Sequence, residues 1–205
     1  DSIVTWRNHP LTRIRKVSFM RIAILLVIAS MLMTAPCSTV VIGEDSRPVL
    51  SVGDEASMFF VRDVTGPAAG KELCYRCRYG EQPVVAVFTR HMTDEVAALV
   101  DGIDAVVEEH AKQGMSAFVV LLDDDPLERE DELKRLARDK RVDNVPLTTF
   151  DDVDGPRSYR LKRDADVTVM MWVDYKIKVN RSFAGSELTE ESVDELIAET
   201  ATILK

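Results

Sequence analysis

The sequence lacks the patterns that point to several large classes of protein. It has no glycine-rich phosphate loop, no His-Glu-x-x-His zinc motif and no internal repeat, which argues against a P-loop NTPase and a zincin-type protease. Lys and Arg number 26 against 35 Asp and Glu, for a formal net charge of −9. A chain with this excess of negative charge is not expected to bind nucleic acid, because the phosphate backbone would repel it.

Cysteine and histidine are also scarce, with three of each in the 205 residues. Cys74 and Cys77 form a single C-x-x-C pair, which supplies two thiolates, whereas a closed zinc site usually takes four ligands. His91 is expected far from that pair, because a predicted strand about 23 Å long lies between them. The chain alone therefore predicts no metal ion or other cofactor, and a four-thiolate site would require a second chain.

The first 43 residues have the layout of a secretory signal peptide. A basic stretch that ends at Arg21 is followed by an apolar run, residues 22–33, interrupted only by Ser30. Small and turn-forming residues come next, which is typical of a cleavage region. As a helix, the apolar run would rise only about 18 Å, which is too short for a hydrocarbon core of roughly 30 Å.

We therefore predict that residues 1–43 are a signal peptide or N-terminal extension, cleaved after Cys37 or Gly43, and that the protein is exported to the periplasm or secreted. The alternative is an uncleaved anchor through residues 22–33, and only then would the membrane be a partner. An exported compartment is usually oxidising, so a local disulfide between the two remaining cysteines is expected.

Residues 44–205 alternate between strand and helix patterns, as in an α/β domain. Two apolar runs, residues 83–89 and 117–123, predict neighbouring parallel strands that are buried on both faces. Between them, Thr93 is placed to cap a helix that continues to Gly114. Three further elements are predicted: a first strand over residues 57–64, a helix that begins at Asp125 and Pro126, and a third central strand over residues 146–150.

The end of the chain predicts an antiparallel hairpin followed by a helix. Residues 167–173 and 176–183 have strand patterns joined by a short turn. Three apolar residues of the second strand are expected to face the same side of the sheet, and Thr189 is placed to cap the last helix. The three residues are Ile177, Val179 and Phe183.

This order of elements resembles the thioredoxin fold, and most closely its redoxin branch, which includes peroxiredoxins and membrane-anchored thiol-disulfide proteins. The resemblance covers about residues 52–205. Segment 51–66 resembles the opening of the family, and segment 159–183 resembles its closing hairpin. The resemblance implies a three-layer α/β sandwich with a mixed central sheet, an N-terminal strand extension and a C-terminal ββα unit.

Both halves of the redox site of that family are missing here. The resemblance places the reactive cysteine at the start of the helix after strand 83–89, where this chain has Thr93 followed by two acids. The cis-proline of the family corresponds to Val167, which is expected to be trans because a cis peptide without proline costs about 3 kcal/mol. Acids suit a helix N-terminus for structural reasons alone.

The C-x-x-C pair precedes the central strand instead of following it. Cys74 and Cys77 are therefore expected at the N-terminal end of strand 83–89, at the opposite pole from Thr93. Their neighbours are candidates for modulating the pair: arginine charge would favour a thiolate, and tyrosine rings would shield or present the sulfurs. These neighbours are Arg76, Arg78, Tyr75 and Tyr79.

Three interpretations of the pair remain open: a structural disulfide, a redox-exchange centre, and a metal site completed by another chain. Two functions follow. One is an exported thiol-disulfide oxidoreductase that uses Cys74 and Cys77 on a protein thiol or disulfide partner, with Cys74 as the attacking thiol. The other is a redox-inactive thioredoxin-fold binding or scaffold module, in which the Cys74–Cys77 disulfide is structural.

Overall fold

A seven-stranded mixed sheet organises the part of the chain that the computed structural model describes, residues 49–204. The strands lie in the order β2-β1-β5-β4-β3-β6-β7. The predicted signal peptide or extension, residues 1–43, lies outside the described residues, together with its apolar run and Cys37. The strand bounds are Val61–Asp63 (β1), Glu72–Leu73 (β2), Val84–Thr89 (β3), Ser116–Asp123 (β4), Leu147–Asp151 (β5), Val167–Val173 (β6) and Lys176–Phe183 (β7).

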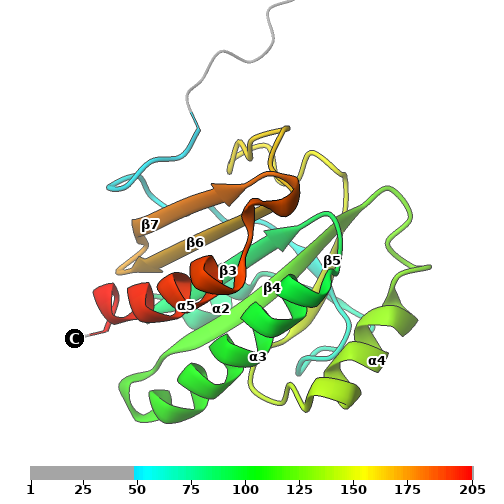
Figure 1. Ribbon diagram of the computed structural model, residues 1–205, viewed down its shortest axis with the longest axis horizontal. Helices are drawn as coiled ribbons and strands as arrows, with labels where there is room; N and C mark the ends of the chain where they lie inside the picture. Colours follow the sequence, from blue (N-terminus) through cyan, green and yellow to red (C-terminus); the bar gives the residue numbers. More distant parts are fainter. Residues whose placement is uncertain (1–48, 205) are drawn as a thin grey trace, which may run out of the picture. The chain divides into compact units, whose positions relative to one another are not determined.

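The two central strands are parallel neighbours, as predicted. β3 pairs with β4 so that Val84 lies opposite Ser116, and β4 pairs in parallel with β5. On the other side, β6 runs antiparallel to β3, and β7 runs antiparallel to β6, which confirms the closing hairpin (Figure 1). β1 lies antiparallel to β5 and carries the short strand β2 at the edge of the sheet.

The sheet is covered on both faces, which explains why its central strands are apolar throughout. All residues of β3 and β6 are buried. Because side chains alternate along a strand, Val85 and Val87 belong to one core cluster, and Ala86 and Phe88 belong to another. The first cluster includes α3 and α5, which lie side by side on one face (Figure 1). The helices are α2 (Tyr75–Tyr79), α3 (Asp94–Glu109), α4 (Glu130–Lys140) and α5 (Glu190–Glu199).

The second face is covered by α2 and by irregular segments. Tyr75 is the buried residue of α2, and Leu50, Phe59, Tyr159 and Leu161 pack into the same cluster from outside the helices and strands. The predicted three-layer α/β sandwich with a mixed sheet is confirmed, although within residues 49–204 its third layer contains only one short helix. That short helix carries the C-x-x-C pair.

The helix caps that the sequence predicts at Thr93 and Thr189 are present, but α3 ends earlier than predicted. The hydroxyl of Thr93 accepts a hydrogen bond from the N–H of Val96, and Thr189 caps α5 in the same way. The α-helical part of α3 ends at Glu109, before Gly114. One 3₁₀ turn lies between them, and Gly114 ends that turn with a φ of 78°, a conformation that costs glycine little.

Two predicted boundaries are wrong. β1 covers only Val61–Asp63 within the expected strand 57–64, because β5 pairs with β1 only at Arg62 and Asp63. The fourth helix begins at Glu130 and not at Asp125 and Pro126. The carboxylate of Asp123 accepts a hydrogen bond from the N–H of Asp125, and this side-chain turn competes with helix formation.

The last strand does not present its apolar residues to one face. Ile177 packs into the second cluster, whereas Val179 packs into the first. The pairing with β6 shifts between Met171 and Trp172, which lie opposite Val179 and Ile177 respectively. Lys178 is therefore an extra residue in the ladder, and such a bulge reverses the facing of the residues beyond it. The strict alternation assumed from the sequence breaks at this point.

Within residues 49–204, no helix is both long enough and apolar enough to cross a membrane.

Candidate functional site

The two cysteines of the C-x-x-C pair lie at the start of α2 and are joined by a disulfide. Cys74 is the N-cap residue of this five-residue helix, and its sulfur accepts a hydrogen bond from the N–H of Cys77 at 3.1 Å. One helical turn brings residues three apart onto the same side, here with a Cα–Cα distance of 5.2 Å. The local disulfide that the sequence led us to expect is present.

The two cysteine residues differ in their exposure to solvent. Cys74, which lies between β2 and α2, is buried, with 4% of its surface exposed. Cys77 is exposed. A partner in solution can therefore reach one end of the disulfide and not the other. The C-x-x-C spacing alone does not indicate which cysteine is accessible.

The two tyrosines anchor α2 to the sheet. Tyr75 stacks on Phe118 of β4 with ring centroids 5.2 Å apart, and Tyr79 packs against Tyr75 at 5.3 Å. The hydroxyl of Tyr79 donates a hydrogen bond to the carbonyl of Ala117. Burial raises the pKa of Tyr79 above its usual range, although the neighbouring Arg78 acts in the opposite direction. Tyr79 is therefore a neutral packing group.

A buried carboxylate beneath Tyr75 was missed by sequence reasoning. Asp63, at the end of β1, is fully buried and accepts hydrogen bonds from the N–H groups of Gly66 and Ala68. Burial, and then the charge of Asp63, raise the pKa of Tyr75 above its usual range. An Asp three residues before a Gly is a common turn signal, but nothing in the sequence pairs this turn with Tyr75.

The two arginines have different surroundings. Arg76 is held against the body of the protein: its guanidinium lies 3.9 Å from the ring centre of Tyr175 and donates hydrogen bonds to the carbonyl of Ala56 and to Glu55. Arg78 is exposed beside Tyr79. Of the two, Arg78 is the cation that an approaching partner would meet.

The contacts of α2 place it at the N-terminal ends of β3 and β4. Tyr175 belongs to the turn after β6, whose last residues pair with the start of β3. Ala117, which Tyr79 contacts, is the second residue of β4. Thr93 follows the other end of β3, where Thr89 pairs with Val167. These contacts agree with the prediction, made from the order of the residues in the chain, that the cysteines and Thr93 lie at opposite ends of β3.

The pole at which the resemblance places a reactive cysteine is a hollow of about 590 Å³ without sulfur among its lining residues. Thr93, Val167 and Thr189 line it, together with His91. The peptide before Val167 is trans, as predicted, since residues 49–204 contain no cis peptide. The carboxylate of Glu95 accepts hydrogen bonds from the backbone of Glu95 and from Thr93, and these lower its pKa. This pole therefore carries an ionised acid.

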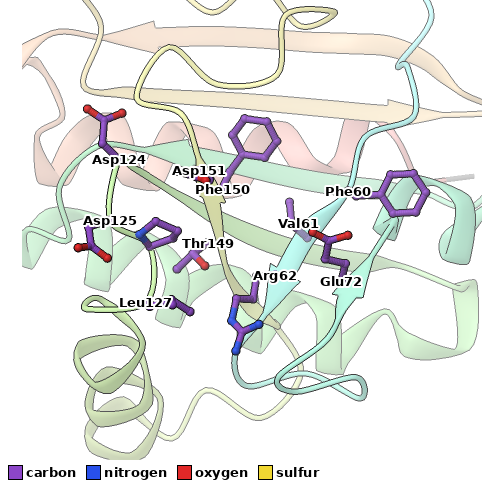
Figure 2. A pocket seen from close by; sticks show the side chains of 11 residues that line it. Phe60, Val61, Arg62, Glu72, Asp124, Asp125, Leu127, Thr149, Phe150 and Asp151 are labelled. Carbon is purple, nitrogen blue, oxygen red and sulfur yellow. The ribbon is translucent and has the colours of Figure 1, made fainter.

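A second hollow, of about 440 Å³, lies where β1 meets the end of β5. Thr149 and Phe150 of β5, Arg62 of β1 and Leu127, which follows β4, line it (Figure 2). Its rim carries several carboxylates, and Arg62 is already paired with Glu130 at 2.5 Å. No cysteine lines this hollow, so it is not part of the disulfide site.

The side chains that the structure describes show no group of three or more His, Cys, Asp and Glu residues that could hold a metal ion. Cys74 and Cys77 are bonded to each other. In this state their sulfurs are not free thiolates, which is the form that binds zinc.

No protein-family model matches the sequence, and neither does any curated protein. Solved structures do match. AhpC of Mycobacterium tuberculosis superposes with a TM-score of 0.57 at 15% identity, over 76% of this chain and 98% of that chain. Peroxidoxin BcpB of the same organism gives a TM-score of 0.55 at 20% identity, over 76% and 99% of the two chains.

A third match is the thioredoxin domain of a thiol-disulfide oxidoreductase from Bacteroides vulgatus. It superposes with a TM-score of 0.52 at 14% identity, over 72% of this chain and 99% of that domain. Identities this low concern the fold and not the activity. The strand order, the closing ββα unit and these superpositions agree, and the chain has a thioredoxin-like fold.

Proposed function

We propose that the protein exchanges disulfides with a protein thiol or disulfide partner through Cys74 and Cys77, at the pole of the fold opposite to Thr93. The observation that carries this proposal is the Cys74–Cys77 disulfide with one exposed end, at Cys77, and one buried end, at Cys74. A disulfide that is reachable at one sulfur is open to attack by a thiolate. No cofactor is needed, because the pair itself carries the two electrons.

A contact seen in the disulfide form is expected to stabilise the reduced form of the pair. The N–H of Cys77 points at the sulfur of Cys74, and a hydrogen bond to a thiolate is stronger than one to a neutral sulfur. Stabilising the reduced form raises the reduction potential. The cross-link itself closes a loop of only four residues, for which the chain-entropy model gives about 2 kcal/mol, so its contribution to stability is modest.

A redox titration tests this function. Equilibrating the full chain with glutathione or dithiothreitol buffers and counting free thiols is expected to give a midpoint between about −270 and −120 mV, the range of disulfide-exchange proteins. A midpoint below about −300 mV, which is typical of structural disulfides, would contradict the proposal.

A second candidate function is a redox-inactive binding or scaffold module in which the disulfide only holds α2 in place. The observation that favours it is the burial of Cys74 beside a helix that Tyr75 and Tyr79 pack against β4, because buried structural cysteines are inert. The hollow beside Thr93 also carries no thiol. The same titration separates the two candidates, because a module of this kind has no need of a reducible pair.

We further propose export, on the strength of the sequence of residues 1–43. Expressed in a bacterial host with its natural N-terminal sequence, the protein is expected to begin after Cys37 or Gly43 when the mature N-terminus is determined by mass spectrometry. A mature chain that keeps residues 22–33 and sediments with membranes would favour the anchor instead. Neither result depends on the redox state of the pair.

A further inference from the structure

We propose that Cys77, the second cysteine of the motif, is the sulfur that bonds to the partner, and that Cys74 is the leaving and resolving cysteine. This assignment rests on the proposed function, because it divides the roles within the same pair. It reverses the expectation drawn from the sequence, in which Cys74 attacks. Two observations carry it: the unequal access to the two sulfurs and the hydrogen bond at Cys74.

Access determines which sulfur a partner can attack. Thiol-disulfide exchange requires the incoming thiolate to approach one sulfur in line with the bond that breaks, so the attacked sulfur must be open to solvent. Cys77 is exposed, whereas only 4% of Cys74 is exposed. The residue that follows Cys74 is Tyr75, which is itself buried against Phe118. A protein partner therefore reaches Cys77 first.

The hydrogen bond from the N–H of Cys77 to the sulfur of Cys74 favours the same assignment of roles. When the bond to Cys77 forms, the charge that leaves the old disulfide collects on the sulfur of Cys74. That sulfur already accepts the N–H of Cys77 at 3.1 Å, so the donor is in place before the thiolate appears. Stabilising a thiolate lowers its pKa, and a thiol of lower pKa leaves faster.

The exchange balances without any further reactant. The thiolate of a dithiol partner forms a bond to the Cys77 sulfur, the Cys74–Cys77 bond breaks, and its electron pair stays on Cys74. The second thiolate of the partner then attacks the partner's own sulfur in this mixed disulfide, and Cys77 leaves as a thiolate. The partner is oxidised to a disulfide, and the pair is reduced to two thiols that take up the partner's two protons. The reverse path reduces a partner disulfide, with Cys77 attacking and Cys74 resolving.

Direct mapping of the mixed disulfide tests the assignment in the full, oxidised chain. The chain is incubated briefly with reduced glutathione, quenched with acid and alkylated, and the site of glutathione is found by mass spectrometry. Trypsin cleaves after Arg76, which lies between the two cysteines, so they fall in separate peptides. Glutathione is expected on Cys77 at least tenfold more often than on Cys74.

Variants that keep one cysteine of the pair, both made in a Cys37→Ser background so that no other thiol remains, give an independent measurement. In the folded state, the Cys77 thiol of Cys74→Ser is expected to react with an aromatic disulfide reagent at least tenfold faster than the Cys74 thiol of Cys77→Ser. In guanidinium the two thiols are expected to react at similar rates, which checks that the difference comes from the fold. Both variants keep Tyr75 and Tyr79, which anchor α2.

The outcomes separate the role assignment from the function on which it rests. Glutathione found on Cys74 as often as on Cys77, or more often, would overturn the assignment and leave exchange at this pair intact. Equal rates for the two folded single-cysteine variants would also overturn it. A disulfide that glutathione leaves untouched at any concentration would overturn the proposed function, and the assignment with it.

Discussion

Replacing Cys74 with serine is expected to abolish catalytic disulfide exchange, whereas Thr93→Ala is expected to leave it unchanged. A serine hydroxyl cannot form a disulfide, so Cys74→Ser retains only one thiol of the pair and can neither open nor close it. Thr93 lies in a hollow that no sulfur lines, at the other end of β3. The measurement is the reduction of insulin by dithiothreitol, with and without the protein, as an initial rate.

Both variants are also expected to be less stable, so the assay needs a control for folding. Cys74→Ser loses the cross-link, which is worth about 2 kcal/mol in the chain-entropy model, and Thr93→Ala loses an N-cap hydrogen bond, worth about 1 kcal/mol. Rates are therefore compared at a temperature at which circular dichroism shows each variant folded. Because both variants are folded at that temperature, a difference in rate between them reflects chemistry.

Two results would change the interpretation. If the wild type shows no exchange and Cys74→Ser only melts at a lower temperature, the disulfide is structural and the protein is better described as a binding or scaffold module. If Thr93→Ala abolishes exchange while Cys74→Ser retains it, the active pole has been assigned to the wrong end of β3.

Replacing Gly66 with alanine is expected to destabilise the protein by about 2–3 kcal/mol. A Cβ atom at this position would lie 2.2 Å from the hydroxyl of Tyr75, 2.7 Å from the carboxylate of Asp63 and 2.8 Å from Pro146. Tyr75 cannot move away easily, because its ring is stacked on Phe118 and buried. The measurement is the urea midpoint of unfolding, followed by circular dichroism.

A neighbouring substitution and a double variant show whether the hydroxyl of Tyr75 is responsible. Ala69→Ser changes an exposed residue of the same loop and is expected to shift stability by less than about 0.5 kcal/mol. In a Tyr75→Phe background, Gly66→Ala is expected to cost less by about 1 kcal/mol, because contacting residues couple. A Gly66→Ala protein as stable as the wild type would show that Tyr75 does not pack against this turn, and the anchoring of α2 would need revision.

Local sequence signals predicted the central elements of the fold well. The apolar runs that became β3 and β4 are buried on both faces, as expected for the strands of a parallel sheet that is covered on both sides. Thr93 and Thr189 cap their helices as expected, because an N-cap depends on residues close in sequence. Boundaries were less predictable: β1 is short because it pairs with β5 only at Arg62 and Asp63, and no local pattern records where that pairing stops.

For the candidate site, the sequence by itself determined that two cysteines three residues apart would meet, that they precede the central strand, and that no thiol stands at Thr93. These are facts of spacing and chain order. Only the tertiary structure decided that Cys74 is buried while Cys77 is exposed, and that Arg76 is held by Tyr175. Exposure and pairing depend on segments far apart in the chain: Tyr75 is buried by β4 and by the turn at Gly66, and Tyr175 reaches α2 from the hairpin. The packing of distant segments thus gives the two sulfurs of one short motif unequal access to a partner.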